Sequence, residues 1–122
     1  MSDKLFTKEH EWIKIESNVA IIGITDYAQS ELGDIIFVES PQLGDKFNAG
    51  DVFGTLEAVK TVADLYMPVG SQILEINDKI DSNPELINSD PEGEGWIVKV
   101  TITSKEELKT LLNEKQYQEI IK

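Results

Sequence analysis

The chain has 122 residues, of which 40% are hydrophobic and 28% charged, and this composition predicts a single soluble domain over residues 1–122. Its 23 Asp and Glu residues against 11 Lys and Arg give a net charge of -12, which argues against nucleic acid and anionic membrane surfaces as partners. The lack of cysteine excludes disulfides, Cys-ligated zinc and a thiol nucleophile. The first residues lack an apolar or Arg-rich leader, so we expect a cytoplasmic protein, and we also expect it to be a monomer.

The first half of the chain predicts short strands with one helix. Two runs rich in β-branched residues within 12–22, separated by a polar turn, predict a hairpin. Asp26 as a cap, with a glutamine three residues later and Gly33 as a stop, predicts a short helix near residues 26–32. Apolar residues and Gly-Asp turns within 33–51 then predict further strands of a β-sandwich or barrel.

The middle of the chain places one lysine at a reversal. Two strand-like runs, 52–59 and 62–69, flank Lys60 and predict that it lies at the exposed tip of a hairpin. Glu57 precedes Lys60 by three residues and Asp64 follows it by four, which brings both acids near its ammonium group. A lysine in such a setting is usually a solvated ion pair worth under about 1 kcal/mol.

The second half ends in helices. A long polar stretch, residues 77–95, predicts a loop with one short helical turn. Strict alternation of apolar and polar residues follows at 96–102 and predicts a half-buried strand, which ends a sandwich core at about 11–103. The capping box Ser104-Lys105-Glu106-Glu107, followed by leucines at helical spacing, predicts a C-terminal helical segment over 104–122.

The chain offers little for independent catalysis. His10 is its only histidine, and it has no acidic calcium loop, no Gly-x-Ser-x-Gly motif and no glycine-rich phosphate loop, so metal sites, hydrolase chemistry and nucleotide use lack support. His10 and Glu11 could act as an acid-base pair. A histidine and a glutamate beside a half-buried Trp12 are more often surface residues, and we interpret them in that way.

The setting of Lys60 distinguishes it from a solvated lysine. Glu57, Ala58 and Val59 precede it, Thr61 follows it, and a Met-Pro-Val-Gly segment lies downstream. This setting resembles the modified-lysine hairpin of biotinyl and lipoyl domains, in which a lysine at a tight turn is amide-linked to a cofactor. The chain lacks the methionines that flank a biotinyl lysine and the Asp-Lys-Ala of simple lipoyl domains.

Over nearly its whole length the chain resembles the H-protein family of the glycine cleavage system. That fold is mainly β, a barrel-sandwich hybrid of short strands that carries the lipoyl-lysine hairpin, a short helix near residues 26–32 and C-terminal helices. The matching segments occur in the family's order: His10-Glu11-Trp12, Gly23 to Gln29, Leu32 to Ile35, Glu57 to Lys60, Leu86 to Asn88 and Gly95-Trp96.

The resemblance implies a carrier and not an enzyme, with lipoate amide-linked to Lys60. It implies that the lipoyl group takes an aminomethyl group when glycine decarboxylase (P protein) acts in glycine catabolism. The aminomethyltransferase (T protein) then takes the one-carbon unit, and dihydrolipoyl dehydrogenase (L protein) reoxidises the dithiol. Lipoate-attaching enzymes are the remaining implied partners.

The resemblance also implies a cleft into which the loaded arm folds. Glu11, Asp64 and Glu31 fall at the positions that would hold the amine there. Glu31 departs from the family, in which this position often carries histidine. Ala58 replaces the usual serine before the Val-Lys pair and Thr61 replaces the usual alanine, and neither small change should block lipoylation.

Other functions stay open beside the carrier. The chain could be a lipoyl donor from which the cofactor is relayed to 2-oxoacid dehydrogenases, and stimulation of glycine decarboxylation would separate the two roles. It could also be an unmodified β-sandwich interaction module, which intact-mass analysis with and without Lys60→Ala would reveal. An independent hydrolase or transferase ranks last, because the chain has no nucleophile with a base beside it.

Overall fold

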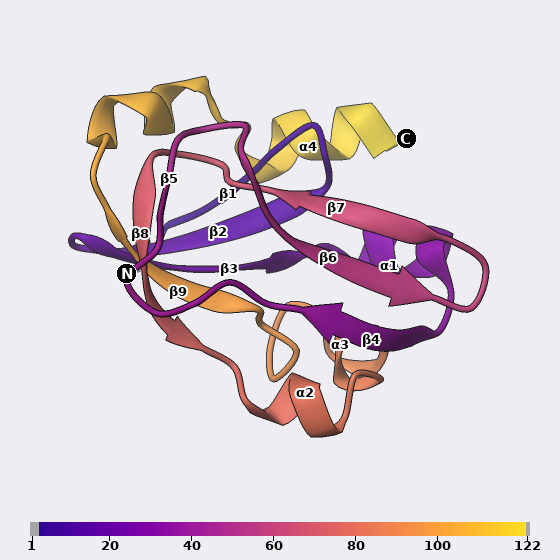
Figure 1. Cartoon of the computed structure of the whole chain (residues 1–122). Helices are drawn as coiled ribbons and strands as arrows, with labels where there is room; N and C mark the ends of the chain where they lie inside the picture. The colour runs from indigo at the N-terminus through magenta and orange to yellow at the C-terminus, as the bar shows by residue number, and fades with distance from the viewer. Residues whose placement is uncertain (1–2, 122) are drawn as a thin grey trace.

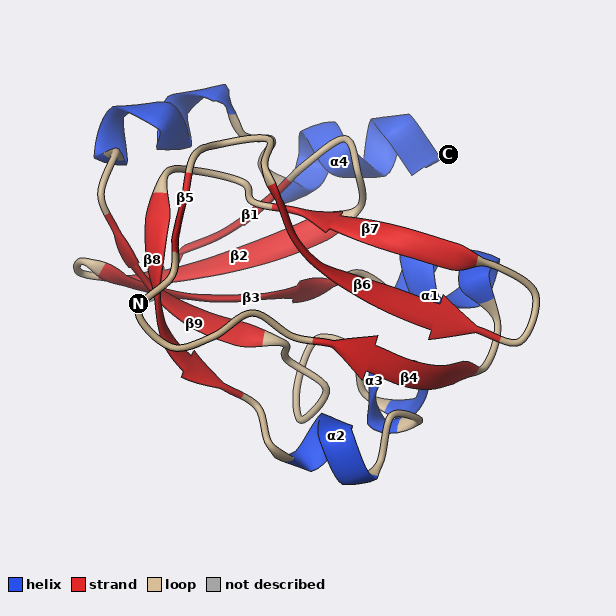
Figure 2. Cartoon of the chain, in the orientation of Figure 1, coloured by secondary structure: helices blue, strands red, loops and turns tan. Residues whose placement is uncertain are grey.

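The computed structural model describes residues 3–121 and contains two antiparallel β-sheets. The strands are β1 (Asp3–Phe6), β2 (Glu11–Glu16), β3 (Val19–Ile24), β4 (Ile35–Glu39), β5 (Lys46–Phe47), β6 (Val52–Ala58), β7 (Val62–Tyr66), β8 (Ser71–Ile76) and β9 (Val98–Ile102). The larger sheet has the order β1-β2-β3-β9-β8-β5 and the smaller one the order β4-β6-β7. Short helices lie around the sheets (Figures 1 and 2). The mainly-β expectation is therefore confirmed.

The helical segments are short. They are α1 (Asp26–Leu32), α2 (Lys79–Ser82), α3 (Leu86–Ser89), a 3-10 helix (Lys105–Thr110) and α4 (Glu114–Ile121). No helix within residues 3–121 is both long enough and apolar enough to span a membrane. The predicted domain and its C-terminal segment extend to residues 1–2 and 122, which lie outside the described residues.

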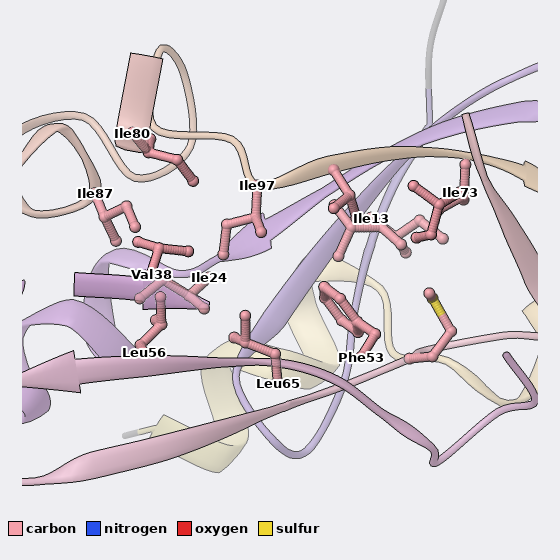
Figure 3. Close-up of a cluster of buried hydrophobic side chains, with 14 of the residues drawn as sticks. Ile13, Ile24, Val38, Phe53, Leu56, Leu65, Ile73, Ile80, Ile87 and Ile97 are labelled. Atoms are coloured by element: carbon pink, nitrogen blue, oxygen red, sulfur yellow. The ribbon is translucent and has the colours of Figure 1, made fainter. Parts of the chain in front are cut away.

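The hydrophobic core lies between the two sheets. Ile13 from the larger sheet and Val38, Leu56 and Leu65 from the smaller one are all buried in one cluster, and Figure 3 shows their side chains spread along the space between the strands. Burying a side chain of this size stabilises the fold by about 1.5–3 kcal/mol. The core therefore holds the smaller sheet, which carries the Lys60 hairpin, against the larger one.

The alternation predicted for the last strand is confirmed over β9. Val98 and Val100 are buried while Lys99 between them is half-buried. The strand begins later than expected, because the alternation breaks at Ile97. The Ile97 side chain is fully buried next to the equally buried Val98, and β9 begins at Val98, so Trp96 and Ile97 lie before the strand.

The predicted helix is confirmed as α1, but its cap differs. Thr25, and not Asp26, is the N-cap, because its hydroxyl accepts a hydrogen bond from the Ala28 N–H at 3.2 Å. Gly33 ends the helix with a φ of 80°, a conformation that glycine adopts without steric cost. The helix therefore spans about two turns, as the sequence predicts.

The polar stretch at 77–95 contains two helical turns where one was predicted. Helix α2 was missed, although Ile80 in α2 and Ile87 in α3 are both fully buried. Asn77 anchors the loop, since its Nδ2 donates to the carbonyls of Glu94 and Trp96. The stretch is held in place by long-range contacts. It therefore lacks the regular helical spacing of apolar residues from which a helix can be predicted in a sequence.

The first strand was not predicted from the sequence. Strand β1 pairs with β2 in antiparallel register, and Phe6 lies opposite Trp12. Phe6, Trp12 and Tyr117 form a second buried cluster on the outside of the larger sheet. The indole Nε1 of Trp12 donates to the Pro91 carbonyl at 3.0 Å, so this cluster fixes a distant loop as well.

The predicted capping box is wrong. The Ser104 side chain caps no helix, and residues 105–110 form a 3-10 helix. The Glu107 carboxylate does not complete the capping box, because it accepts a hydrogen bond from the Gly70 N–H at 2.7 Å. A different capping box begins α4, in which Asn113 and Gln116 bond each other's backbone N–H groups. Asn113 therefore begins the last helix and divides the helical segment predicted over 104–122 into two parts.

Candidate functional site

Lys60 lies in the turn at the tip of the β6–β7 hairpin, and this turn extends beyond the strands of the smaller sheet in Figure 1. The Ala58 N–H donates to the Thr61 carbonyl at 2.8 Å and closes the turn. The Val59 N–H donates to the Asp34 carbonyl at 3.0 Å, which ties the tip to the segment after α1. Val59, Lys60 and Thr61 are exposed, so the hairpin presents the lysine amine on a hydrogen-bonded and not a loose turn.

The acids near Lys60 do not pair with it. Glu57 and Asp64 lie on the same face of the smaller sheet, where Glu57 pairs with Val62 and Asp64 pairs with Thr55. Within residues 3–121, no lysine nitrogen lies within ion-pair distance of either acid. The solvated ion pair considered from the sequence is therefore not formed; Lys60 and Asp64 are exposed, and Glu57 is half-buried.

A cleft of about 260 Å³ opens beside the hairpin. Its walls come from the start of β2 with the turn before it, the end of β3, helix α1, and the edge strand β7 with its neighbour β6. The lining residues are Glu9, His10, Glu11, Ile24, Tyr27, Ala28, Glu31, Leu32, Leu56, Ala63, Asp64 and Leu65. The three residues expected to hold an amine, Glu11, Glu31 and Asp64, thus line one cleft, and their contact with an arm stays a prediction.

The composition of the cleft suits an apolar chain that ends in a cation. Ile24, Leu32 and Leu56 provide hydrocarbon surface, and four acidic side chains share the lining with them. An acidic cleft with apolar walls concentrates field lines and favours a positively charged ligand. Glu31 and Asp64 are exposed, whereas Glu11 is only 2% exposed.

Glu11 is the buried acid of the cleft. Its Oε2 accepts a hydrogen bond from the Tyr66 backbone N–H at 2.7 Å, and its Oε1 accepts one from the Thr7 hydroxyl at 3.2 Å. Burial raises the pKa of the Glu11 carboxyl to about 8, although both hydrogen bonds act in the opposite direction. The carboxyl therefore holds its proton at neutral pH, and a cation beside it would favour ionisation.

The surface interpretation of His10 and Glu11 is wrong. Glu11 and Trp12 are both buried, and His10 is half-buried in the cleft wall with its ring 4.8 Å from that of Tyr27. No local pattern indicates this burial, because it comes from distant segments: Glu11 is bonded to Tyr66 of β7, and Trp12 packs with Tyr117 of α4. His10 and Tyr27 are thus lining residues that the sequence reasoning did not select.

Comparison with known proteins identifies the family. The sequence model described as Glycine cleavage H-protein matches residues 4–122. The chain belongs to the glycine cleavage H-protein family. It is 50% and 49% identical over 120 residues to the glycine cleavage system H proteins of two Staphylococcus epidermidis strains, and each alignment covers 98% of this chain and 95% of the relative.

The fold comparison agrees with the family. The crystal structure of a glycine cleavage system H protein from Mycobacterium marinum matches with a TM-score of 0.89 at 36% identity, covering 96% of this chain and 94% of that one. The resemblance inferred from the sequence is therefore confirmed. H proteins are carrier components of the glycine cleavage system, and this chain is a member of that carrier family.

Proposed function

We propose that this chain carries lipoate on Lys60 and shuttles an aminomethyl group within a glycine cleavage system. The observation that carries the proposal is the exposed Lys60 at a hydrogen-bonded hairpin tip beside an acidic cleft. Within residues 3–121 the amine makes no ion pair, so an attaching enzyme meets an unhindered nucleophile. The residues around it, Glu57, Ala58, Val59 and Thr61, set the shape of the turn.

The cleft fits the attached group. When bound, lipoate supplies a disulfide that accepts the aminomethyl group on one sulfur and is restored by oxidation of the dithiol. The apolar lining offers a wall for the hydrocarbon part of the arm. Glu11, Glu31 and Asp64 would hold the amine, and closure of the cleft around it would exclude water.

Attachment also changes the charge at the hairpin. Amide formation removes the positive charge of Lys60, which leaves the nearby carboxylates of Glu57 and Asp64 without the cation closest in sequence. An amine at the far end of the arm would restore a positive charge beside Asp64. The chain would thus attract its own arm most strongly when the arm is loaded.

The partners proposed are the P, T and L proteins and the lipoate-attaching enzymes. Phe37, Glu57 and Val62 form one row across the three strands of the smaller sheet, and both apolar members are at least half exposed. This surface beside the arm alternates exposed apolar side chains with acidic ones. It would complement a partner whose active-site entrance is surrounded by basic and apolar groups. The net charge of -12 would speed such encounters at low salt.

Mass spectrometry of the intact protein tests the attachment. After incubation with lipoate, ATP and a lipoate-attaching enzyme, we expect the mass of one lipoyl group, mapped to the peptide that contains Lys60. Lys60→Ala should abolish the addition, whereas Lys46→Ala, which removes another exposed lysine, should not. Addition that survives Lys60→Ala would refute the assignment of Lys60.

Glycine decarboxylation tests the carrier role separately. The lipoylated protein should support exchange between bicarbonate and the glycine carboxyl group when P protein is present, and the unmodified protein should support much less. A chain that is lipoylated on Lys60 but inactive in this exchange would refute the carrier role. Transfer of its lipoyl group to a 2-oxoacid dehydrogenase subunit would then indicate the relay function instead.

A further inference from the structure

The C-terminal helix reaches the wall of the cleft through one side chain. Tyr117 of α4 is only 2% exposed, and its ring stacks on Phe6 with a centroid distance of 4.7 Å and an interplanar angle of 7°. Its hydroxyl oxygen lies 2.9 Å from Nδ1 of His10 and 2.7 Å from Oγ1 of Thr25. Tyr117 therefore joins a cleft residue to the N-cap of α1 without lining the cleft itself.

His10 is held in an unusual conformation. Its φ is 69°, in the left-handed region that residues other than glycine seldom adopt. The His10 N–H donates to the Thr7 carbonyl at 3.1 Å, and the His10 carbonyl accepts from the Thr25 N–H at 3.0 Å. A strained backbone conformation persists only where surrounding contacts hold it in place, and such residues are common at functional sites.

The hydrogen-bond directions follow from the donors that must be satisfied. The Thr25 hydroxyl already accepts from the Ala28 N–H, and its only other hydrogen-bond partner within residues 3–121 is Tyr117. Its own proton therefore goes to the Tyr117 oxygen, since a buried hydroxyl proton without an acceptor is costly. Tyr117 in turn donates to Nδ1 of His10. The remaining proton of a neutral His10 ring is then on Nε2, which has no hydrogen-bond partner among residues 3–121.

We propose that Tyr117 is a positioning residue of the cleft. It fixes the His10 ring and its Nε2–H tautomer, and it holds the first turn of α1 beside that ring. The proposal rests on the arm-binding function proposed above, in which the carboxyl groups take the amine. An imidazole N–H is a donor, so His10 would donate to an acceptor at the end of the same arm, and the sulfur that does not carry the aminomethyl group would be such an acceptor.

Nitrogen NMR of the unmodified full-length protein tests the positioning. His10 is the only histidine, so its side-chain nitrogens are assigned without ambiguity. At alkaline pH the wild type should show a single Nε2–H tautomer. Tyr117→Phe keeps the ring and removes the hydroxyl, so both nitrogen resonances should move toward the average of the two tautomers. Unchanged resonances would overturn the proposal.

Variants of Thr25, at the other end of the chain of hydrogen bonds, test the proposal independently if Tyr117→Phe fails to fold. Thr25→Val removes the donor to Tyr117 and should also shift the His10 tautomer. Thr25→Ser keeps a hydroxyl at the N-cap and should restore the wild-type spectrum. If Thr25→Ser and Thr25→Val give the same spectrum, the hydrogen bonds that run from the Thr25 hydroxyl through the Tyr117 hydroxyl to His10 (the hydroxyl chain) do not set the tautomer, and the proposal fails.

The loaded arm provides the second readout. Loss of the aminomethyl group breaks the carbon–sulfur bond and consumes one water, which yields a thiol, formaldehyde and ammonia, and formaldehyde release is measured after loading with P protein and glycine. Tyr117→Phe should accelerate this loss by about three- to tenfold, the range expected for one lost hydrogen bond. Gln118→Ala, an exposed neighbour on α4, should not change the rate.

A variant that is destabilised elsewhere shows whether Tyr117→Phe acts through positioning or only through a loss of stability. Leu108→Ala removes a half-buried side chain packed on the core and leaves the hydroxyl chain intact. If Leu108→Ala releases formaldehyde as fast as Tyr117→Phe at an equal loss of stability, the positioning role is refuted. If the wild type takes no lipoyl group on Lys60, the proposed function fails, and the His10 spectra still decide whether Tyr117 sets the tautomer.

Discussion

Replacing Glu11 by glutamine should make the stability of this protein less dependent on pH. The carboxyl is 2% exposed, and burial raises its pKa to about 8 from the ordinary 4.5. Glutamine has nearly the same shape and does not titrate. Its side-chain oxygen can still accept the hydrogen bond that the Tyr66 N–H donates to Glu11.

The direction in which the free energy of unfolding changes with pH follows from how many protons the folded and unfolded states bind. Between about pH 4.5 and 8 the folded protein holds the Glu11 proton and the unfolded chain does not, so unfolding releases a proton. The contribution of the protonated Glu11 is fully present below about pH 4.5 and is lost as the pH rises through about 8. One pKa unit corresponds to about 1.4 kcal/mol, so the whole effect is at most about 5 kcal/mol.

Urea denaturation measures this effect directly. Trp12 is buried, and its fluorescence should report unfolding of both proteins between about pH 5.5 and 9. Subtracting the unfolding free energy of Glu11→Gln from that of the wild type cancels the other carboxylates. The difference should fall with rising pH by up to about 1.4 kcal/mol per pH unit and level off above pH 8. A difference that does not vary with pH would refute the reasoning about burial of Glu11.

Three further variants test the packing and the cleft. Gly23→Ala should lower the free energy of unfolding by about 1–3 kcal/mol in urea denaturation, because the new Cβ would lie 2.8 Å from the Trp12 indole. Asn88→Ala should lower it by about 1–3 kcal/mol in the same assay, since its side chain makes three hydrogen bonds that join α3 to the end of α1 and the start of β4, whereas exposed Ser89→Ala should have little effect. Asp64→Asn should leave the intact mass of the lipoylated protein normal, apart from the substitution, and shorten the lifetime of the loaded arm several-fold by formaldehyde release. An unchanged lifetime would remove Asp64 from the amine site.

Local patterns in the sequence predicted the elements that carry the site. The alternation at β9, the glycine stop after α1 and the reversal at Lys60 are short-range signals, since each depends on residues within a few positions of one another. The family followed from motifs spread over the chain and is confirmed by the match over residues 4–122. Elements without a local pattern were missed, such as β1 and α2, whose residues are held by distant partners.

The sequence by itself determined the family, the mainly-β architecture and the position of Lys60 at a hairpin tip, because periodicity and turn residues act locally. Only the tertiary structure decided that Glu11 is buried between Thr7 and Tyr66, and that Tyr117 reaches His10 across 107 residues of sequence. Burial and hydrogen-bond partners depend on which segments the sheets bring together. The chemistry of the cleft is therefore a property of the folded chain, whereas the place of the lysine is already fixed by the residues around it.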